Sequence, residues 1–194
     1  VRVLTRHASG LDEMDWADDV DVVEGDASSA YDLDTAMRDV DVAFYLIHSM
    51  DGAGDFAQRD RELARTFADA ADRARVGRIV YLSGLHPDGE ELSPHLASRV
   101  EVGQVFLDAE TPAAVLQAAV ILGDGSASFD MLRHLTHRLP AMVAPRWLHN
   151  RIQPIAIRDV LHLLVGAASL PREVNRTFDI GGPDVLTYEE MMQR

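Results

Sequence analysis

A histidine and an arginine four residues apart, His95 and Arg99, form the pair of side chains in this sequence that is best suited to chemistry. Residues 94–110 are predicted to form a helix, on which positions i and i+4 project from one face. Val102 and Phe106 continue that face as an apolar stripe. A histidine can act as general acid or base near neutral pH, and the neighbouring arginine favours its neutral form. The pair either lines a cleft and handles a ligand, or marks a partly solvated helix end.

The elements that must position this pair follow from an alternation of apolar strand patterns with helical patterns. Strands are predicted over residues 1–5, 19–23, 42–47, 78–83 and 113–122, and helices over residues 31–38, 56–75 and 94–110. The run 42–47 is apolar enough to be buried on both faces, as in a parallel sheet. This alternation predicts an α/β fold, a doubly wound parallel sheet in a single domain over residues 1–194.

The pattern becomes less regular in the last third of the chain. Further elements are predicted as a helix over residues 129–139, a strand over 151–157, a helix over 158–170 and a strand over 176–182. Thr187 and Glu190 then form a capping-box pattern that opens another helix. We expect the C-terminal part, about residues 124–194, to cover the substrate side of the sheet.

Ligands of such sheets bind outside the carboxyl ends of the strands, so the residues that end each strand are the candidate site residues. They are Thr5–Arg6, Asp26–Ala27, His48–Ser49, Ser83–Gly84 and Ala118–Gly123. His48 is either a ligand contact and alternative acid, or a structural histidine. His134 and His137 lie three residues apart with no evident carboxylate partner, so no metal site is predicted.

The segment Gly52–Ala57 matches G-x-G-x-x-A, a dinucleotide-binding pattern, but we interpret it as a loop that leads into a helix. Four residues separate it from the preceding strand, whereas the pattern requires a glycine at the turn itself. Asp51 and Asp55 would also place carboxylates where a pyrophosphate should sit.

The first strand of the doubly wound order 3-2-1-4-5-6, its glycine loop and the first helix are expected to be missing. Residues 1–5 match the second strand of that order, and residues 42–47 match the fourth. We therefore expect an open place in the sheet between these two segments. Both ends of the chain are expected to be cut, because each falls inside a predicted element.

The composition excludes several classes of partner. The net charge of −14, with no lysine, argues against nucleic acid and anionic membranes, which both require clustered positive charge. No apolar run approaches the ~20 residues of a membrane span. The absence of cysteine excludes disulfides and fits a cytoplasmic protein. The acidity favours a halophilic origin, and a high-GC genome is the alternative explanation for the missing lysine.

Eight segments, in order and at this spacing, resemble the NAD(P)-binding, NmrA-like kind of atypical short-chain dehydrogenase/reductase, which has a Rossmann-like fold. They are VRVLTR, VEGDAS, VAFYLIHSM, RIVYLSGL, SPHLASRVEVG, VLQAAVILGDGS, RIQPIAIRDV and FDIGGPDVLTYEEM. The resemblance covers nearly all of the chain, starting from the family's second strand.

This resemblance includes informative departures. The family's catalytic Tyr-x-x-x-Lys falls on His95-x-x-x-Arg99, so both residues are replaced. The family's serine falls near Ser83 or Gly84. Where family members read Leu-Arg-Pro-Gly in the sixth strand, this chain reads Leu-Gln-Ala-Ala over residues 116–119.

The resemblance implies a nicotinamide dinucleotide as cofactor, and Arg6 favours NADP. In dinucleotide folds an acid at the end of the second strand holds the ribose hydroxyl of NAD, whereas an arginine there accommodates the 2′-phosphate of NADP. Thr5-Arg6-His7 offers no acid, so NADP is expected and NAD is the alternative. The resemblance also implies that Asp26 contacts the adenine amino group, a turn aspartate being the alternative.

The candidate site residues fall into two overlapping sets. The expected cofactor contacts are Arg6, Asp26, Ala27, Leu46, Ile47, Ser83, Arg99 and Ala118. The expected catalytic residues are His95, Arg99, Ser83 and His48.

Two functions remain open for this chain. The first is an NADP-dependent oxidoreductase acting on an unidentified small carbonyl or quinone-like substrate. The second is a non-catalytic dinucleotide binder, either a redox sensor resembling NmrA or a scaffold resembling the accessory NAD(P)-binding subunit of respiratory NADH dehydrogenase. A nucleotide-sugar epimerase or dehydratase is disfavoured by the loss of Tyr-x-x-x-Lys. A homodimer is left open.

Overall fold

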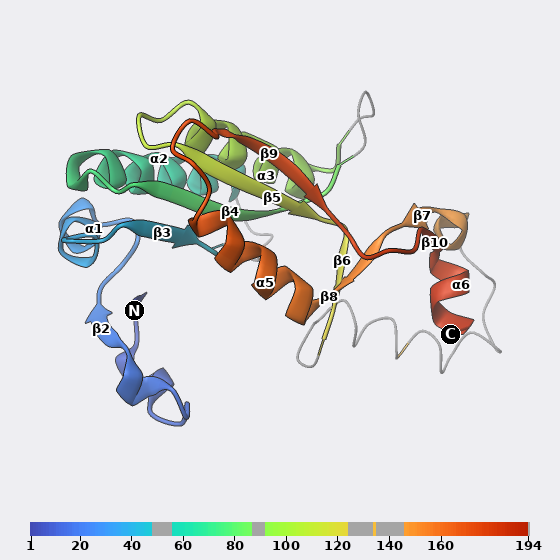
Figure 1. Cartoon of the computed structure of the whole chain (residues 1–194), viewed down its shortest axis with the longest axis horizontal. Helices are drawn as coiled ribbons and strands as arrows, with labels where there is room; N and C mark the ends of the chain where they lie inside the picture. The colour runs from blue at the N-terminus through green and yellow to red at the C-terminus, as the bar shows by residue number, and fades with distance from the viewer. Residues whose placement is uncertain (48–55, 87–91, 124–133, 135–145, 194) are drawn as a thin grey trace.

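In the computed structural model, residues 1–47, 56–86, 92–123, 134 and 146–193 are described. The main sheet has four parallel strands in the order β3-β4-β5-β9 (Figure 1). The strands are β3 (Val42–Tyr45), β4 (Arg78–Gly84), β5 (Ala113–Ala118) and β9 (Arg176–Ile180). The strands pair in parallel through helical crossovers and helices lie on both faces of the sheet, so the predicted doubly wound α/β sheet is confirmed.

Helices cover both faces of this sheet (Figure 1). On one face α2 (Phe56–Ala74) and α3 (Pro94–Leu107) pack together over β3, β4 and β5. On the other face α5 (Ile157–Ala168) packs with Val160 and Leu164 against Val80 and Leu116. Two cores therefore flank the sheet, and the α2–α3 core is the larger.

A separate parallel pair, β1 (Arg2–Thr5) and β2 (Asp21–Glu24), precedes α1 (Ala30–Ala36). Two short 3₁₀ turns, η1 (Ala8–Leu11) and η2 (Ala17–Asp19), connect the two strands. Among the described residues, β1 pairs with β2 alone and does not pair with β3. The predicted open place between residues 1–5 and 42–47 is confirmed by this separation.

The predicted strand over residues 113–122 is wrong as a single element. It divides at Ala119 into β5 and β6 (Val120–Leu122), and β6 leaves the main sheet to pair with β8 (Pro154–Ala156). An apolar run does not show where the chain bends, because the two halves are both apolar and differ only in their partner strands.

The remaining short elements lie beside this second pair of strands. They are η4 (Arg146–His149), β7 (Arg151–Ile152), β10 (Leu186–Thr187) and α6 (Tyr188–Gln193), with β7 and β10 antiparallel. The predicted capping box is confirmed, because Glu190 accepts from the Thr187 backbone N–H over 2.8 Å and Thr187 Oγ1 accepts from the Glu190 N–H over 3.1 Å. The predicted helix over 129–139 lies outside the described residues, apart from His134.

The expectation that residues 42–47 are buried on both faces is wrong. Ala43 and Tyr45 pack into the α2–α3 core, whereas Phe44 is 42% exposed on the opposite face. The physical reason is that α5 packs over β4 and β5, so that it leaves this end of the sheet uncovered in the described part of the chain.

Four aromatic rings from four elements form the centre of the larger core. Tyr45, Phe67, Tyr81 and Phe106 come from β3, α2, β4 and α3, and all are buried. Tyr45 meets Phe67, Phe106 and Tyr81 edge-on, with ring centroids 5.0, 4.9 and 5.8 Å apart. Such pairs stabilise by ~0.5–1.5 kcal/mol each beyond their burial. The cluster fixes both helices on the two strands.

Arg78, the first residue of β4, ties the turn between α5 and β9 to the sheet. It is 2% exposed, and its guanidinium donates to the carbonyls of Val174, Leu170 and Pro171 over 2.8, 3.3 and 2.6 Å. Burial of this charge is tolerated because three acceptors satisfy it.

We predict that Arg78→Met lowers the free energy of unfolding by about 3 kcal/mol, because it leaves three carbonyl acceptors without their charged donor. Urea denaturation measures this loss. Arg73→Met is the matched control: its ion pair with Asp34, at 2.7 Å, is about half exposed on both sides. It should cost less than ~1 kcal/mol. Equal losses in the two variants would contradict this role of Arg78.

Candidate functional site

A row of polar residues crosses the sheet at the carboxyl ends of three strands. Ser83, Gln117 and Asp179 are register partners on β4, β5 and β9. Their side chains lie on the α2–α3 face, since Tyr81 and Val115, two residues earlier, pack into that core. Ser83 and Gln117 are buried, whereas Asp179 is exposed at the edge strand. The row lies where ligands of doubly wound sheets bind.

Helix α3 brings Arg99 to the end of β4. The helix begins as predicted, with the Ser93 hydroxyl accepting from the Leu96 N–H and Pro94 in the first turn. A Cβ added to Gly84 would lie 2.9 Å from Leu96 Cδ1 and 3.6 Å from Arg99 Cδ, so the strand end and the helix are in close contact. The Ser83 hydroxyl also donates to the Arg99 carbonyl over 3.5 Å.

His95 lies one turn earlier on α3 and has a different neighbour. Its imidazole stacks on the ring of Phe56, the first residue of α2, with centroids 4.5 Å apart and planes 20° apart. The side chain is exposed. Val102 and Phe106 are buried in the core, as the predicted stripe requires. The structure thus places Arg99 against Ser83 and Gly84, and holds His95 against the start of α2.

A buried polar bond between α2 and α3 was not predicted. Ser98 Oγ donates to Asp60 Oδ2 over 3.0 Å, and both residues are buried. This bond fixes the turn of α3 that lies between His95 and Arg99. A signal for it was present, because Asp60 interrupts the apolar stripe of α2 four residues after Phe56.

Arg6 follows the end of β1, and Asp26 follows the end of the neighbouring strand β2. Asp26 Oδ1 accepts from the Ser28 backbone N–H over 2.8 Å. That bond, with the Ser28 hydroxyl, holds the pKa of Asp26 below its ordinary value, and the charge of Arg6 acts in the same direction. Arg6 is exposed and makes no hydrogen bond or ion pair within the described chain. The turn interpretation of Asp26 is therefore realised.

The other predicted cofactor residues differ in how far they are buried. Ala27 is half-buried against the α2–α3 core. Leu46 and Ile47 follow β3 and are 51% and 41% exposed. Ala118 is buried at the end of β5, beside Gly84 in register, and its carbonyl accepts from the Leu85 N–H over 2.9 Å.

Several predicted positions fall outside the described residues. They are His48, Ser49, His137 and most of the glycine pattern Gly52–Ala57. His134 is described and exposed. Within the described ranges, no group of three or more histidine, aspartate or glutamate side chains is arranged to hold a metal ion, and no helix is long and apolar enough to cross a membrane.

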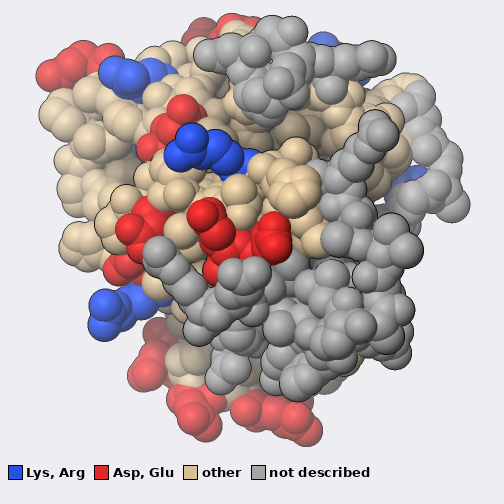
Figure 2. Space-filling model, turned by 90° about the vertical axis from the view of Figure 1, so that its right-hand side faces the viewer, with Lys and Arg blue, Asp and Glu red and all other residues tan. Residues whose placement is uncertain are grey.

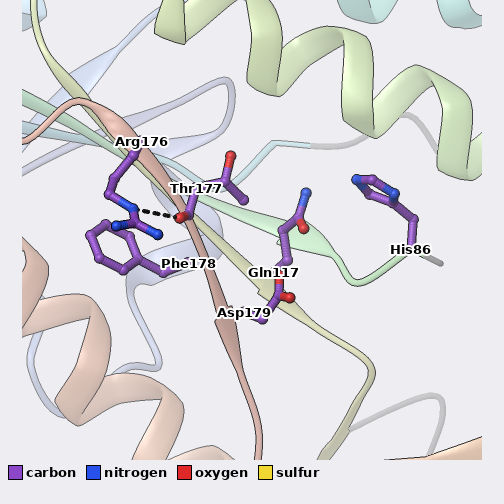
Figure 3. Close-up of a pocket in the computed structure, with 6 residues that line it drawn as sticks. All are labelled: His86, Gln117, Arg176, Thr177, Phe178 and Asp179. Carbon is purple, nitrogen blue, oxygen red and sulfur yellow. Dashed lines mark hydrogen bonds between the residues drawn. The ribbon is translucent and has the colours of Figure 1, made fainter. Parts of the chain in front are cut away.

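A pocket of about 590 Å³ opens beside the polar row and was not predicted (Figure 3). Its walls are His86, Gln117 and the β9 residues Arg176–Asp179. Thr177 and Asp179 share the face of Gln117, whereas Arg176 and Phe178 lie on the other side of β9. The one signal in the sequence was Gln117 itself, a polar residue inside an otherwise apolar strand.

The profile of the NAD(P)H-binding family matches residues 1–121. The chain belongs to this family, and its likeness to an atypical short-chain dehydrogenase/reductase is confirmed at that level. No curated protein matches the sequence.

Three solved structures with the same fold are distant in sequence from this chain. WbmG from Bordetella bronchiseptica, in complex with NAD, has a TM-score of 0.71 and 14% identity, over 90% of this chain and 61% of its own. The UDP-N-acetylglucosamine 4-epimerase of Bacillus cereus has a TM-score of 0.72 and 18% identity, over 99% and 73%.

DesIV, a dTDP-glucose 4,6-dehydratase from Streptomyces venezuelae with NAD and TYD bound, has a TM-score of 0.74 and 19% identity, over 100% of this chain and 69% of its own. This chain therefore spans less than two thirds of WbmG and somewhat more of the other two. At these identities the structural likeness establishes the fold alone. The chemistry of this chain has to be argued from its own site residues.

We predict that Asp26 stabilises the folded chain above pH ~3.8 and loses this effect as the pH falls through its lower folded pKa. The sign follows because near that pH the unfolded chain binds more protons at this carboxyl than the folded chain. Urea denaturation of wild type and Asp26→Asn at several pH values measures it, with a difference of less than ~1 kcal/mol at pH 7. A difference that is independent of pH would contradict the prediction.

Proposed function

We propose that this chain binds a nicotinamide dinucleotide at the carboxyl edge of its sheets and prefers NADP to NAD. The observation that carries the proposal is Arg6, an exposed guanidinium at the end of β1 with no hydrogen bond or ion pair to the described residues. A cation at this place in a dinucleotide fold suits a 2′-phosphate. The neighbouring carboxylate of Asp26 is held in a turn by Ser28.

The described residues fit the two ends of such a cofactor. Arg6, Asp26 and Ala27 would hold the adenosine end, with the second Asp26 oxygen facing the adenine amino group. Ser83, Arg99 and Ala118 would hold the nicotinamide end, where Arg99 can donate to ribose hydroxyls. Leu46 and Ile47 offer exposed apolar surface at the end of β3. A bound dinucleotide would supply or accept a hydride.

An oxidoreductase of a small carbonyl or quinone-like substrate is the first form of this function. His95 would then hold or release a proton at an imidazole nitrogen, with Arg99 one turn away and Ser83 at the strand end as a hydrogen-bonding partner. His48 is the alternative proton donor. The stacking on Phe56 fixes the plane of the His95 ring and leaves its edge exposed.

A non-catalytic redox sensor or scaffold is the second form, and the exposure of His95 favours it. A general acid is more effective in a site that excludes water, and this imidazole lies on the surface against α2. The chain also lacks the Tyr-x-x-x-Lys pair of the family it resembles.

The proposal also covers the domain organisation, the location and the origin of the chain. We infer a single domain over residues 1–194 in which about 124–194 cover the substrate side, and a cytoplasmic location, because the chain has no cysteine. The acidic, lysine-free composition fits a halophilic origin, since molar salt screens the repulsion among carboxylates.

We predict that Arg6→Ala weakens NADPH binding by about 10- to 100-fold and leaves NADH binding nearly unchanged, because only NADPH loses a charge-assisted phosphate contact. Fluorescence titration with both cofactors measures the two affinities. Arg172→Ala is the control: it removes one exposed arginine from the turn between α5 and β9 and should change neither affinity. Equal weakening of NADPH and NADH in Arg6→Ala would overturn the preference for NADP.

We predict that Arg99→Ala weakens binding of both cofactors, because ribose hydroxyls lose a charged donor. His95→Ala should leave both affinities nearly intact. If the chain is a reductase, His95→Ala should also slow turnover by ~10²–10⁴-fold, the usual loss on removing a general acid. Steady-state kinetics with quinone and aldehyde substrates decides between the two forms of the function. If His95→Ala leaves turnover unchanged, another residue is the proton donor. If the wild type shows no turnover, the non-catalytic sensor or scaffold is favoured.

A further inference from the structure

The amide of Gln117 makes no hydrogen bond to the described residues, although the residue is only 7% exposed. Enclosed polar groups of folded proteins are almost always paired, so an amide without a protein partner needs another one, either water or a ligand. Because every fully enclosed side-chain polar atom of the described residues does have a partner, the Gln117 amide must open onto the adjoining pocket.

The pocket supplies further polar groups on the same face. Thr177 and Asp179 lie beside Gln117 on β9, with Asp179 as its register partner, and His86 lies across the pocket after β4 (Figure 3). A carboxylate accepts hydrogen bonds, and an amide both donates and accepts them. Gln117 and Asp179 together can bind two adjacent hydroxyl groups of one ligand.

The charge of the pocket wall selects against ionic ligands. Among the described residues that line it, Arg176 is the one cation and Asp179 the one anion, so these two formal charges cancel. Arg176 is already engaged: its guanidinium lies 5.1 Å from the centroid of the Phe178 ring, and its Nε donates to the Thr177 carbonyl over 3.2 Å. No further basic side chain lines the described pocket to neutralise a diphosphate.

The surrounding protein adds to this selection. The chain carries a net charge of −14, and on the face turned to the viewer in Figure 2 the acidic side chains lie in groups while the arginines are scattered. A negative surface lowers the local concentration of anions.

We propose that this pocket is a binding site for a small uncharged molecule with adjacent hydroxyl groups, held by Gln117 and Asp179. If the chain binds a dinucleotide as proposed, this pocket beside Ser83 is its substrate site, and that role rests on the proposed function. Binding of the ligand itself does not require the cofactor.

Saturation-transfer NMR of the full chain with glycerol, myo-inositol and glucose tests the proposal, with choline and UDP-glucose as the cationic and anionic comparisons. We expect at least one uncharged polyol to bind more tightly than both comparisons. Gln117→Leu and Asp179→Asn should each weaken that binding by about 3- to 10-fold, the scale of one hydrogen bond. The control Gln104→Leu, which removes an exposed amide bonded to Asp108 on α3, should not.

Thermal unfolding of Gln117→Leu separates a binding role from a structural one. If the amide is kept for a ligand, leucine should leave the melting temperature unchanged or raise it, because the amide makes no hydrogen bond to the described residues that the substitution would break. A clear fall would show that Gln117 stabilises the fold and would overturn the proposal. Asp179→Asn, at an exposed position, keeps the binding test valid if the leucine variant is unstable.

Three further outcomes of the NMR experiment would contradict the proposed polyol site. Failure of all three polyols to bind, equal binding to the wild type and both variants, or tighter binding of UDP-glucose would each overturn the proposal. NADPH titration of the same samples keeps the two proposals distinct. NADPH binding without polyol binding removes this inference alone, whereas polyol binding without NADPH binding removes the dinucleotide function and leaves the pocket.

Discussion

The edge-to-face contacts among Tyr45, Phe67, Tyr81 and Phe106 hold two strands and two helices in one arrangement. Because Phe106 lies near the end of α3 and Tyr81 in the middle of β4, the same contacts hold the helix along the strand, and the first half of α3 then reaches the end of β4. Arg99 meets Ser83 and Gly84 there as a result of this packing. Burial raises the pKa of both Tyr45 and Tyr81, so the cluster stays uncharged and apolar at physiological pH.

Much of the fold could be predicted because apolar residues recur with a different spacing in its strands and in its helices. The strands of the main sheet are short apolar runs, α2 and α3 have helical stripes, and Ser93 and Pro94 signal a helix start. The division of residues 113–122 could not be predicted, because both halves are apolar and only their partner strands differ. The exposure of Phe44 depends on where α5 lies, which is a tertiary property.

The proximity of candidate residues was predictable wherever topology alone decides it. Arg6 and Asp26 follow neighbouring strands because parallel strands end at one edge, and Ser83 ends the strand against which Arg99 packs. The stacking of His95 on Phe56, the bond between Asp60 and Ser98 and the pocket beside Gln117 depend on side-chain placement between distant segments. A polar residue inside an apolar pattern was the available signal at Asp60 and at Gln117, and it marks a position without naming its partner.

The anchoring of the α5–β9 turn by Arg78 has a consequence for the order in which the chain folds. The bond from Arg78 to Val174 joins residues 96 positions apart, whereas β3, β4 and β5 are neighbours along the chain. Closing so long a loop costs entropy that only later contacts repay, so β9 joins a sheet that is already formed. We therefore expect the strand that carries Thr177 and Asp179 to be the last part of the polar row to assemble. In a partly unfolded chain we expect it to open first, while the aromatic core remains in place.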